Sequence, residues 1–142
     1  MDANVVWKGR MAFDGAADTG FTVRMDSAPD VGGDNSGPRP VELLLIGLAG
    51  CTAMDVISIL KKMRQDVTGF EVRAHGERAS EHPRKFTHIT IEYVLTGSNI
   101  DPAAAQKAID LSATRYCSVQ ASLDPAIKVE HVLTIHNTAD AT

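Results

Sequence analysis

The sequence has no concentration of basic residues. Its 14 Lys and Arg residues are outnumbered by 18 Asp and Glu, which gives a formal net charge of −4. A protein that binds nucleic acid needs Lys and Arg gathered on one face to neutralise the phosphates. We therefore expect no nucleic-acid partner. With 44% hydrophobic and 23% charged residues, the composition is that of a folded globule.

Signals for export and for membrane insertion are also missing. The N-terminus (MDAN) lacks a basic region followed by an apolar one. The longest apolar run, residues 43–51, is too short to cross a bilayer, and Asp55 interrupts its continuation. We therefore expect a cytoplasmic protein that makes no contact with a membrane.

Cysteine is scarce, because the chain contains only Cys51 and Cys117. Their wide separation excludes a CxxC redox motif. Two cysteines in a cytosolic chain are more often catalytic, redox-active or inert than a structural disulfide. The 5 histidines are scattered without zinc-type spacing, so we expect no metal site. No glycine-rich phosphate loop is present, and we expect no cofactor.

The 142 residues predict a single domain, residues 1–142. Its first part is rich in strand and turn signals, with strands expected at residues 4–8, 10–13 and 20–25. The first two are predicted to be one strand interrupted by a bulge at Gly9, with a turn at Asp14-Gly15 after it. Residues 26–40 are rich in Gly, Pro, Asp and Asn and predict a long loop.

Residues 41–63 predict a helix that is apolar on nearly every side as far as Leu60. Pro40 suits its first turn, and Lys61 and Lys62 suit its C-terminus. A helix that is apolar all round is a buried helix. A sheet of about five strands in so short a chain gives too little cover for it. We therefore expect a second subunit to supply the rest.

The whole chain predicts an α+β fold on antiparallel sheet, in the order β-β-α-β-β-α-β. Alternation predicts that Ile89, Ile91 and Tyr93 face inward. Asp101 and Pro102 together are typical of the start of a helix. The expected elements are strands at residues 69–79, 86–95 and 127–136, a helix from 102 to about 115, and a short helix at 118–123.

Cys51 lies in the middle of the apolar helix. A lone buried cysteine is usually a small core residue. Gly47 and Gly50, however, weaken a helix and indicate that something approaches it closely, either another helix or a ligand. A reactive cysteine must ionise, and Asp55 one turn further on disfavours a thiolate. Reactivity therefore requires a nearby cation, for which the candidates are Arg10, Arg39, Arg78, Arg84 and Arg115.

Several segments of the sequence resemble the OsmC/Ohr family, the osmotically induced and organic hydroperoxide resistance proteins. They are residues 37–40 (GPRP), 42–51 (ELLLIGLAGC) and 116–119 (YCSV). Residues 51–56 (CTAMDV), 64–67 (RQDV) and 86–89 (FTHI) resemble a less characterised OsmC-like branch. The resemblance covers nearly the whole chain. It implies antiparallel sheets wrapped around two central helices in an intertwined homodimer.

The resemblance also implies a peroxiredoxin-like thiol peroxidase that reduces organic hydroperoxides. Cys51 matches the cysteine that attacks the peroxide, and Cys117 matches the resolving cysteine that then forms a disulfide with it. An external dithiol would restore the thiols. Better-known branches carry a glutamate where this chain has Val41. Glu42 lies on another side of the helix, where it suits the helix N-terminus.

The resemblance leaves the activating arginine open. Arg10 is nearest to the place that the organic hydroperoxide resistance branch uses, and Arg39 or Arg84 could serve instead. Val41 keeps open a second function, a protein that binds a small hydrophobic or electrophilic ligand in a dimer cleft without turnover. A third is a structural dimer with two inert thiols.

Overall fold

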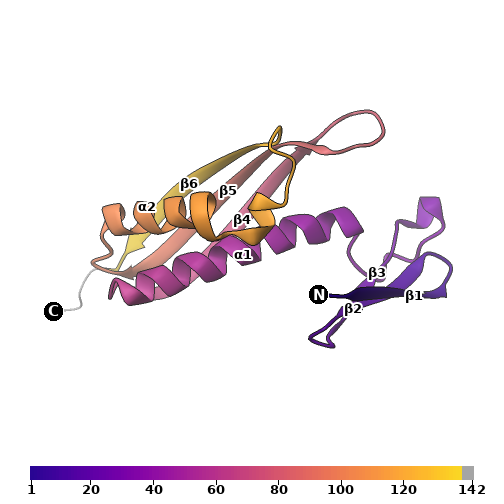
Figure 1. Ribbon diagram of the computed structural model, residues 1–142, viewed down its shortest axis with the longest axis horizontal. Helices are drawn as coiled ribbons and strands as arrows, with labels where there is room; N and C mark the ends of the chain where they lie inside the picture. The colour runs from indigo at the N-terminus through magenta and orange to yellow at the C-terminus, as the bar shows by residue number, and fades with distance from the viewer. Residues whose placement is uncertain (139–142) are drawn as a thin grey trace. The chain divides into compact units, whose positions relative to one another are not determined.

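The computed structural model describes residues 1–138, which form an α+β structure (Figure 1). The contacts separate two units, residues 1–44 and the chain from Leu45 onward. That the whole chain is one domain stays a prediction. The elements are β1 (Ala3–Gly9), β2 (Ala12–Ala17), β3 (Thr22–Met25), a 3₁₀ turn η1 (Pro29–Val31), α1 (Pro40–Lys62), β4 (Asp66–Arg78), β5 (Phe86–Ser98), α2 (Pro102–Leu111), a π-helical turn η2 (Ser112–Tyr116), α3 (Ser118–Ala121) and β6 (Lys128–Asn137).

The first unit holds one antiparallel sheet in the order β1-β2-β3. The prediction of one strand with a bulge at Gly9, followed by a turn at Asp14-Gly15, is wrong, because β1 and β2 are separate antiparallel strands whose register shifts between Trp7 and Gly9. The chain reverses after Gly9 instead, because Gly9 and Arg10 adopt left-handed φ values of 106° and 50°. Asp14 lies within β2, where it binds the Arg24 guanidinium on β3. The sheet therefore has one more strand than the sequence predicts.

Asp26 organises the loop that follows this sheet. Its carboxylate accepts the backbone N–H groups of Ser27, Asp34 and Ser36 at 2.8, 3.1 and 3.1 Å, and the Ser36 hydroxyl at 2.6 Å. The hydroxyl, followed by the backbone donors, holds the pKa of Asp26 well below its usual 3.8, although burial opposes them. Asp26 is 4% exposed, so these bonds replace its lost hydration.

Helix α1 begins and ends as predicted. The Glu42 carboxylate accepts the Arg39 N–H at 2.8 Å, which satisfies one free donor at the N-terminus. Lys61 and Lys62 occupy the last turn. As expected, the single chain does not cover α1 on all sides, and burial of the rest by a second subunit stays a prediction. The buried residues of α1 form one stripe, Leu48, Thr52, Val56 and Leu60, and Ile46 and Met54 are 59% and 74% exposed.

By length and composition α1 could cross a bilayer, which corrects the expectation from the run 43–51. The apolar character resumes after Asp55 and continues to Leu60, so the whole helix counts rather than the shorter run. It is nevertheless a core helix. Its buried stripe faces the sheet of the second unit, where Thr52 hydrogen-bonds to Tyr93 of β5 (Figure 1).

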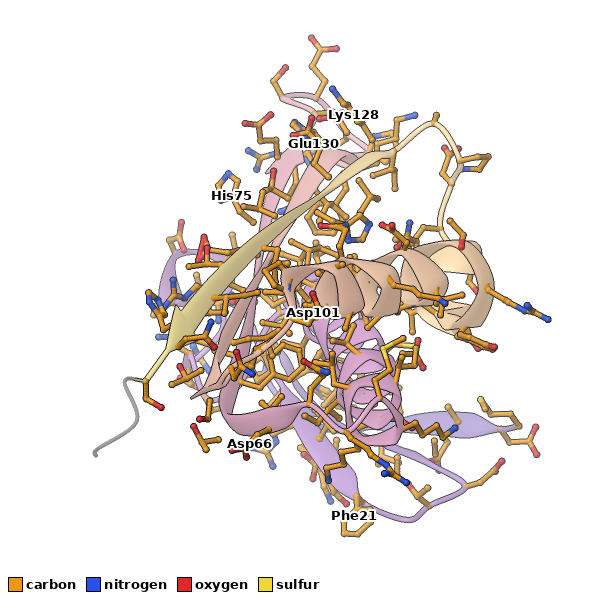
Figure 2. All side chains as sticks on the ribbon, turned by 90° about the vertical axis from the view of Figure 1, so that its left-hand side faces the viewer. Phe21, Asp66, His75, Asp101, Lys128 and Glu130 are labelled. Carbon is orange, nitrogen blue, oxygen red and sulfur yellow. The ribbon has the colours of Figure 1, made fainter. Side chains whose placement is uncertain are left out.

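The sheet of the second unit has the order β4-β5-β6. β4 and β5 form the predicted antiparallel hairpin, and Ile89, Ile91, Tyr93 and Leu95 face inward as expected. β6, however, pairs with β5 in parallel, which corrects the all-antiparallel expectation. β5 ends near Asp101, the cap of α2 (Figure 2). The helical crossover from Asp101 brings the chain back to the end of the sheet at which β5 begins, and β6 starts there.

Candidate functional site

The structure brings Cys51, Asp55 and Cys117 together in the second unit. The two sulfurs and a carboxylate oxygen all lie within 4.8 Å of one another. Both cysteines are free; Cys51 is half-buried, and Cys117 is 4% exposed. Cys51 and Asp55 face the same way because they are one turn apart on α1. The sequence predicts the importance of the two cysteines but not their proximity, and it predicts no cluster of metal ligands at all.

A change from α-helix to π-helix precedes Cys117 in the chain and positions it beside Cys51. The sequence predicts a helix as far as about residue 115, but α2 ends at Leu111 and continues as the π-helical turn η2. π-Helical turns are rare and frequently lie at functional sites. The Cys117 N–H closes the turn on the Ser112 carbonyl at 2.8 Å. Cys117 itself is extended and caps α3, so that its sulfur accepts the Gln120 N–H at 3.4 Å.

The environment of Cys117 keeps its thiol protonated. Burial raises the pKa of Cys117 above its usual 9.0, and the neighbouring Cys51 sulfur adds to the rise. The Gln120 N–H acts in the opposite direction because it favours the thiolate. A thiol in this state reacts as a nucleophile only when a base removes its proton.

A buried chain of hydrogen bonds leads from the sheet to Asp55. His131 Nδ1 lies 2.9 Å from the Tyr93 hydroxyl, which lies 2.8 Å from Thr52 Oγ1. Thr52 Oγ1 in turn lies 2.8 Å from Ser112 Oγ, which donates to Asp55 Oδ2 at 2.9 Å. Thr52, Tyr93 and Ser112 are fully buried. The chain joins β6, β5, α1 and η2, so it fixes the carboxylate relative to the sheet.

The hydrogen bond from Ser112 to Asp55 determines which group donates in every other bond of this chain. Each hydroxyl has one proton, and Ser112 gives its proton to Asp55. Thr52 must then donate to Ser112, Tyr93 to Thr52, and His131 Nδ1–H to Tyr93. Burial lowers the pKa of His131 and raises the pKa of Tyr93 to about 12. A neutral His131 with its proton on Nδ1 and a protonated Tyr93 satisfy these requirements.

The candidate arginines lie in both units of the chain. Arg10 and Arg39 bind partners within the first unit, Asp34 Oδ2 at 3.0 Å and Asn35 Oδ1 at 2.7 Å. Arg84 is exposed in the β4–β5 hairpin. Within residues 45–138, no arginine forms an ion pair with Asp55. The two remaining candidates have partners other than Asp55. Arg78 donates to the Arg84 carbonyl, and the Arg115 guanidinium lies over the Tyr116 ring.

A cavity of about 260 Å³ opens beside Asp55. Its walls carry one cation, Lys62, and one aromatic ring, Tyr116; the other lining residues are Ser58, Ile59 and Leu111. The cavity therefore offers a small ligand both apolar contact and a positive charge close to the carboxylate. The sequence does not indicate it, because its walls come from α1, α2 and η2.

Comparisons with known proteins agree with this fold. The chain is 42% identical to protein YhfA of Escherichia coli K12 over 131 residues, which cover 92% of this chain and 95% of YhfA. A hypothetical protein of Aquifex aeolicus has a similar structure, with 27% identity, a TM-score of 0.84 and 97% of each chain covered. An organic hydroperoxide resistance protein of Legionella pneumophila shares the fold at 12% identity and a TM-score of 0.69, with 94% and 95% covered.

The chain also matches a protein family over most of its length. Residues 33–132, which include both cysteines and the start of α1, match the family described as OsmC-like protein. The resemblance predicted from the segments around Cys51 and Cys117 is thereby confirmed. The chain belongs to the OsmC-like protein family.

Proposed function

We propose that this protein reduces organic hydroperoxides with Cys51 and Cys117. The observation that carries the proposal is that two free cysteines, distant in sequence, have their sulfurs within 4.8 Å of each other. A disulfide joins two sulfurs at about 2.05 Å, so the two sulfurs have to approach by less than about 3 Å to form one. The name of the Legionella pneumophila relative adds support, because it describes that protein as an organic hydroperoxide resistance protein.

In the proposed reaction, the Cys51 thiolate attacks the distal oxygen of the hydroperoxide. The O–O bond breaks, the alcohol leaves with a proton, and Cys51 becomes a sulfenic acid. Cys117 then attacks the Cys51 sulfur, a disulfide forms and water leaves. An external dithiol reduces the disulfide and returns both thiols.

The two cysteines suit different steps. Cys51 is half-buried, so a hydroperoxide can reach it, whereas Cys117 is 4% exposed. Because its pKa is raised, Cys117 waits as a thiol and needs a base at the resolving step. We assign that role to Asp55, whose carboxylate lies within 4.8 Å of both sulfurs. The proton passes to the hydroxide that leaves the sulfenic acid, so the step balances as loss of water.

The cation that activates Cys51 remains a proposal too. Arg10, Arg39 and Arg84 stay candidates from the resemblance; in the structure Arg10 binds Asp34 and Arg39 binds Asn35. Lys62 is a further candidate, because it lines the cavity beside Asp55. A cation there offsets the carboxylate that otherwise disfavours the thiolate.

We propose that the working form is a cytoplasmic, intertwined homodimer. Large apolar side chains of α1, such as Ile46 and Met54, are exposed in the single chain. Gly47 and Gly50 have nothing within 4 Å of an added Cβ, so a second helix can approach there closely. A second copy would cover this surface.

The test is consumption of cumene hydroperoxide with dithiothreitol as reductant. We expect turnover by the parent protein and none by Cys51→Ser. Cys117→Ser should still consume one equivalent in a single turnover, and its Cys51 sulfenic acid should be trapped by dimedone. Exposed Ser118→Ala, beside Cys117, serves as the matched control and should keep parental turnover. Parental turnover by Cys51→Ser would refute the proposal.

The cavity beside Asp55 favours one alternative, a binding protein without turnover. Its Lys62 and Tyr116 would hold a small ligand with an apolar part and a negative charge. Such a ligand would protect Cys51 from alkylation while no hydroperoxide is consumed. Turnover that depends on Cys51 would exclude this alternative.

A further inference from the structure

We propose that Cys51, Cys117 and Asp55 form a site for a thiophilic divalent cation, with Zn²⁺ as the best fit. Their three potential ligand atoms lie within 4.8 Å of one another. The ligands come from one helix and from the residue after η2, so the fold assembles a site that no spacing in the sequence indicates. The proposal does not depend on the peroxidase activity, because metal binding is measured without a hydroperoxide.

The distances fit a tetrahedral ion after a small adjustment. Zinc binds thiolate sulfur at about 2.3 Å and carboxylate oxygen at about 2.0–2.2 Å, which puts two ligands of one ion roughly 3.6–3.8 Å apart. The atoms here lie within 4.8 Å, so closure needs a shift of at most about 1 Å at each pair. Cys51 and Asp55 are half-buried, so their side chains can turn towards the buried Cys117 sulfur.

The ligand types select the metal. Two thiolates and a carboxylate carry three negative charges, and thiolates favour soft or borderline ions over Mg²⁺ and Ca²⁺. Three protein ligands leave one of the four tetrahedral positions to water or a small ligand.

Two of the three ligands are already held by a second layer of hydrogen bonds. Ser112 donates to Asp55 at 2.9 Å, which occupies one of the roughly four lone-pair sites of a carboxylate and leaves the others open. The Gln120 N–H points at the Cys117 sulfur at 3.4 Å, as is favourable for a metal-bound thiolate. The chain through Thr52 and Tyr93 anchors Ser112 itself. Metal ligands in proteins are oriented in this way.

Metal binding and disulfide formation exclude each other in this arrangement, because both need the same two sulfurs. The metal should therefore protect both cysteines from iodoacetamide. Protein whose cysteines are already alkylated should bind no metal. Under the proposed peroxidase function, bound metal would also hold the thiols back from the hydroperoxide.

The experiment titrates reduced, metal-free protein with Zn²⁺ against a chromogenic chelator, and with Co²⁺ as a spectroscopic probe. We expect one ion per chain, with thiolate-to-cobalt charge transfer and the strong visible bands of a tetrahedral site. Cys51→Ser and Cys117→Ser should abolish stoichiometric binding, and Asp55→Asn should weaken it. Ser112→Ala should weaken it about 10–100-fold, as second-layer substitutions do. Exposed Asp66→Asn is the matched control and should bind as the parent does.

Three results would each overturn the site: no stoichiometric binding by the parent, parental affinity in either cysteine variant, or parental affinity in Asp55→Asn. Circular dichroism checks that each variant is folded. Where a cysteine variant is unfolded, the alkylated parent protein takes its place in the titration. Zinc binding without hydroperoxide turnover would support the metal site and refute the peroxidase. Hydroperoxide turnover without zinc binding would support the peroxidase and refute the metal site.

Discussion

Residues 1–44 and residues 45–138 differ in how much apolar surface they bury within themselves. The structure describes every residue of the first unit, and Ala12 is its single buried apolar side chain. Trp7 and Phe21 are 64% and 80% exposed. Figure 2 labels Phe21. The second unit fully buries side chains such as Leu60, Ile91 and Tyr93. Hydrogen bonds order the first unit, in its strand ladder and in the loop around Asp26, whereas the second unit has a packed core.

The difference shows where each unit obtains its stability. A sheet of three strands needs a covering layer on its apolar face, because exposed apolar side chains contribute no burial energy. The second unit has that layer in α1 and α2. The first unit has none within residues 1–44, so its apolar face depends on protein surface from elsewhere. In the homodimer that we propose, the partner subunit supplies it.

The largest expected effect comes from the core of the second unit. Leu60 is fully buried, so Leu60→Ala should lower the free energy of unfolding by about 2–5 kcal/mol, from lost transfer energy and the cavity left behind. Urea unfolding by circular dichroism measures it. Within one folded subunit, Ile46→Ala on the same helix should change it by at most about 0.5 kcal/mol, since Ile46 is 59% exposed.

The pair also tests the homodimer. If a second copy covers Ile46, Ile46→Ala should leave the subunit folded but shift sedimentation velocity towards the monomer as the protein is diluted. Leu60→Ala should lower stability at every protein concentration. If both variants lost the same free energy of unfolding and neither dimer dissociated, the contrast between the buried and the exposed side of α1 would be contradicted.

A smaller effect is expected at the buried hydrogen-bond chain of the second unit. Thr52→Val keeps the shape of the side chain but removes the acceptor of the Tyr93 O–H and the group that donates to the Ser112 hydroxyl. A buried polar group left unpaired costs about 1–3 kcal/mol, so the free energy of unfolding should fall by that amount. Thr52→Ser, which keeps the hydroxyl, should recover most of the loss.

The matched control for this substitution is Thr87→Val on β5. Thr87 is exposed, and its hydroxyl binds a backbone carbonyl in contact with water. Its loss should change the free energy of unfolding by at most about 0.5 kcal/mol. The buried chain would not be a source of stability if both valine variants behaved alike in urea.

Local features of the fold were predictable from the sequence. Pro40 and the two lysines at residues 61–62 mark the ends of α1, and the cap at Asp101 marks the start of α2. Alternation identified the inward face of β5 around Tyr93. Each of these signals acts over a few residues. The turn at Gly9 was missed because Asp14-Gly15 carries the stronger turn signal, which pairing within the sheet overrides.

The site was predictable only in its two cysteines. Thr52 bonds to Tyr93 across 41 residues and to Ser112 across 60, and no local pattern predicts such pairs. One signal was available, a polar threonine on the buried stripe of an apolar helix, which requires a hydrogen-bond partner. The proximity of Cys117 depends on η2, and the parallel pairing of β6 on the whole crossover.

The smallest effect concerns the first unit and its dependence on pH. The pKa of Asp26 lies well below the 3.8 that it has when unfolded, so its contribution to stability is complete above that value. It is lost as the pH falls from 3.8 through the lower pKa of the folded state. Amide hydrogen exchange at Asp34 and Ser36, whose N–H groups bind Asp26, should therefore accelerate in that range relative to the intrinsic rate.

Asp26→Asn should remove this dependence, because its amide does not titrate, and should expose both amides to exchange already at neutral pH. Asp30→Asn is the matched control, since Asp30 is exposed in the same loop. Amides of β5 should keep their protection in both variants, because the core of the second unit does not involve Asp26. If the amides of β5 lost protection together with those of the loop, the two units would unfold as one. The two units would then differ in how much apolar surface they bury but not in having independent stability.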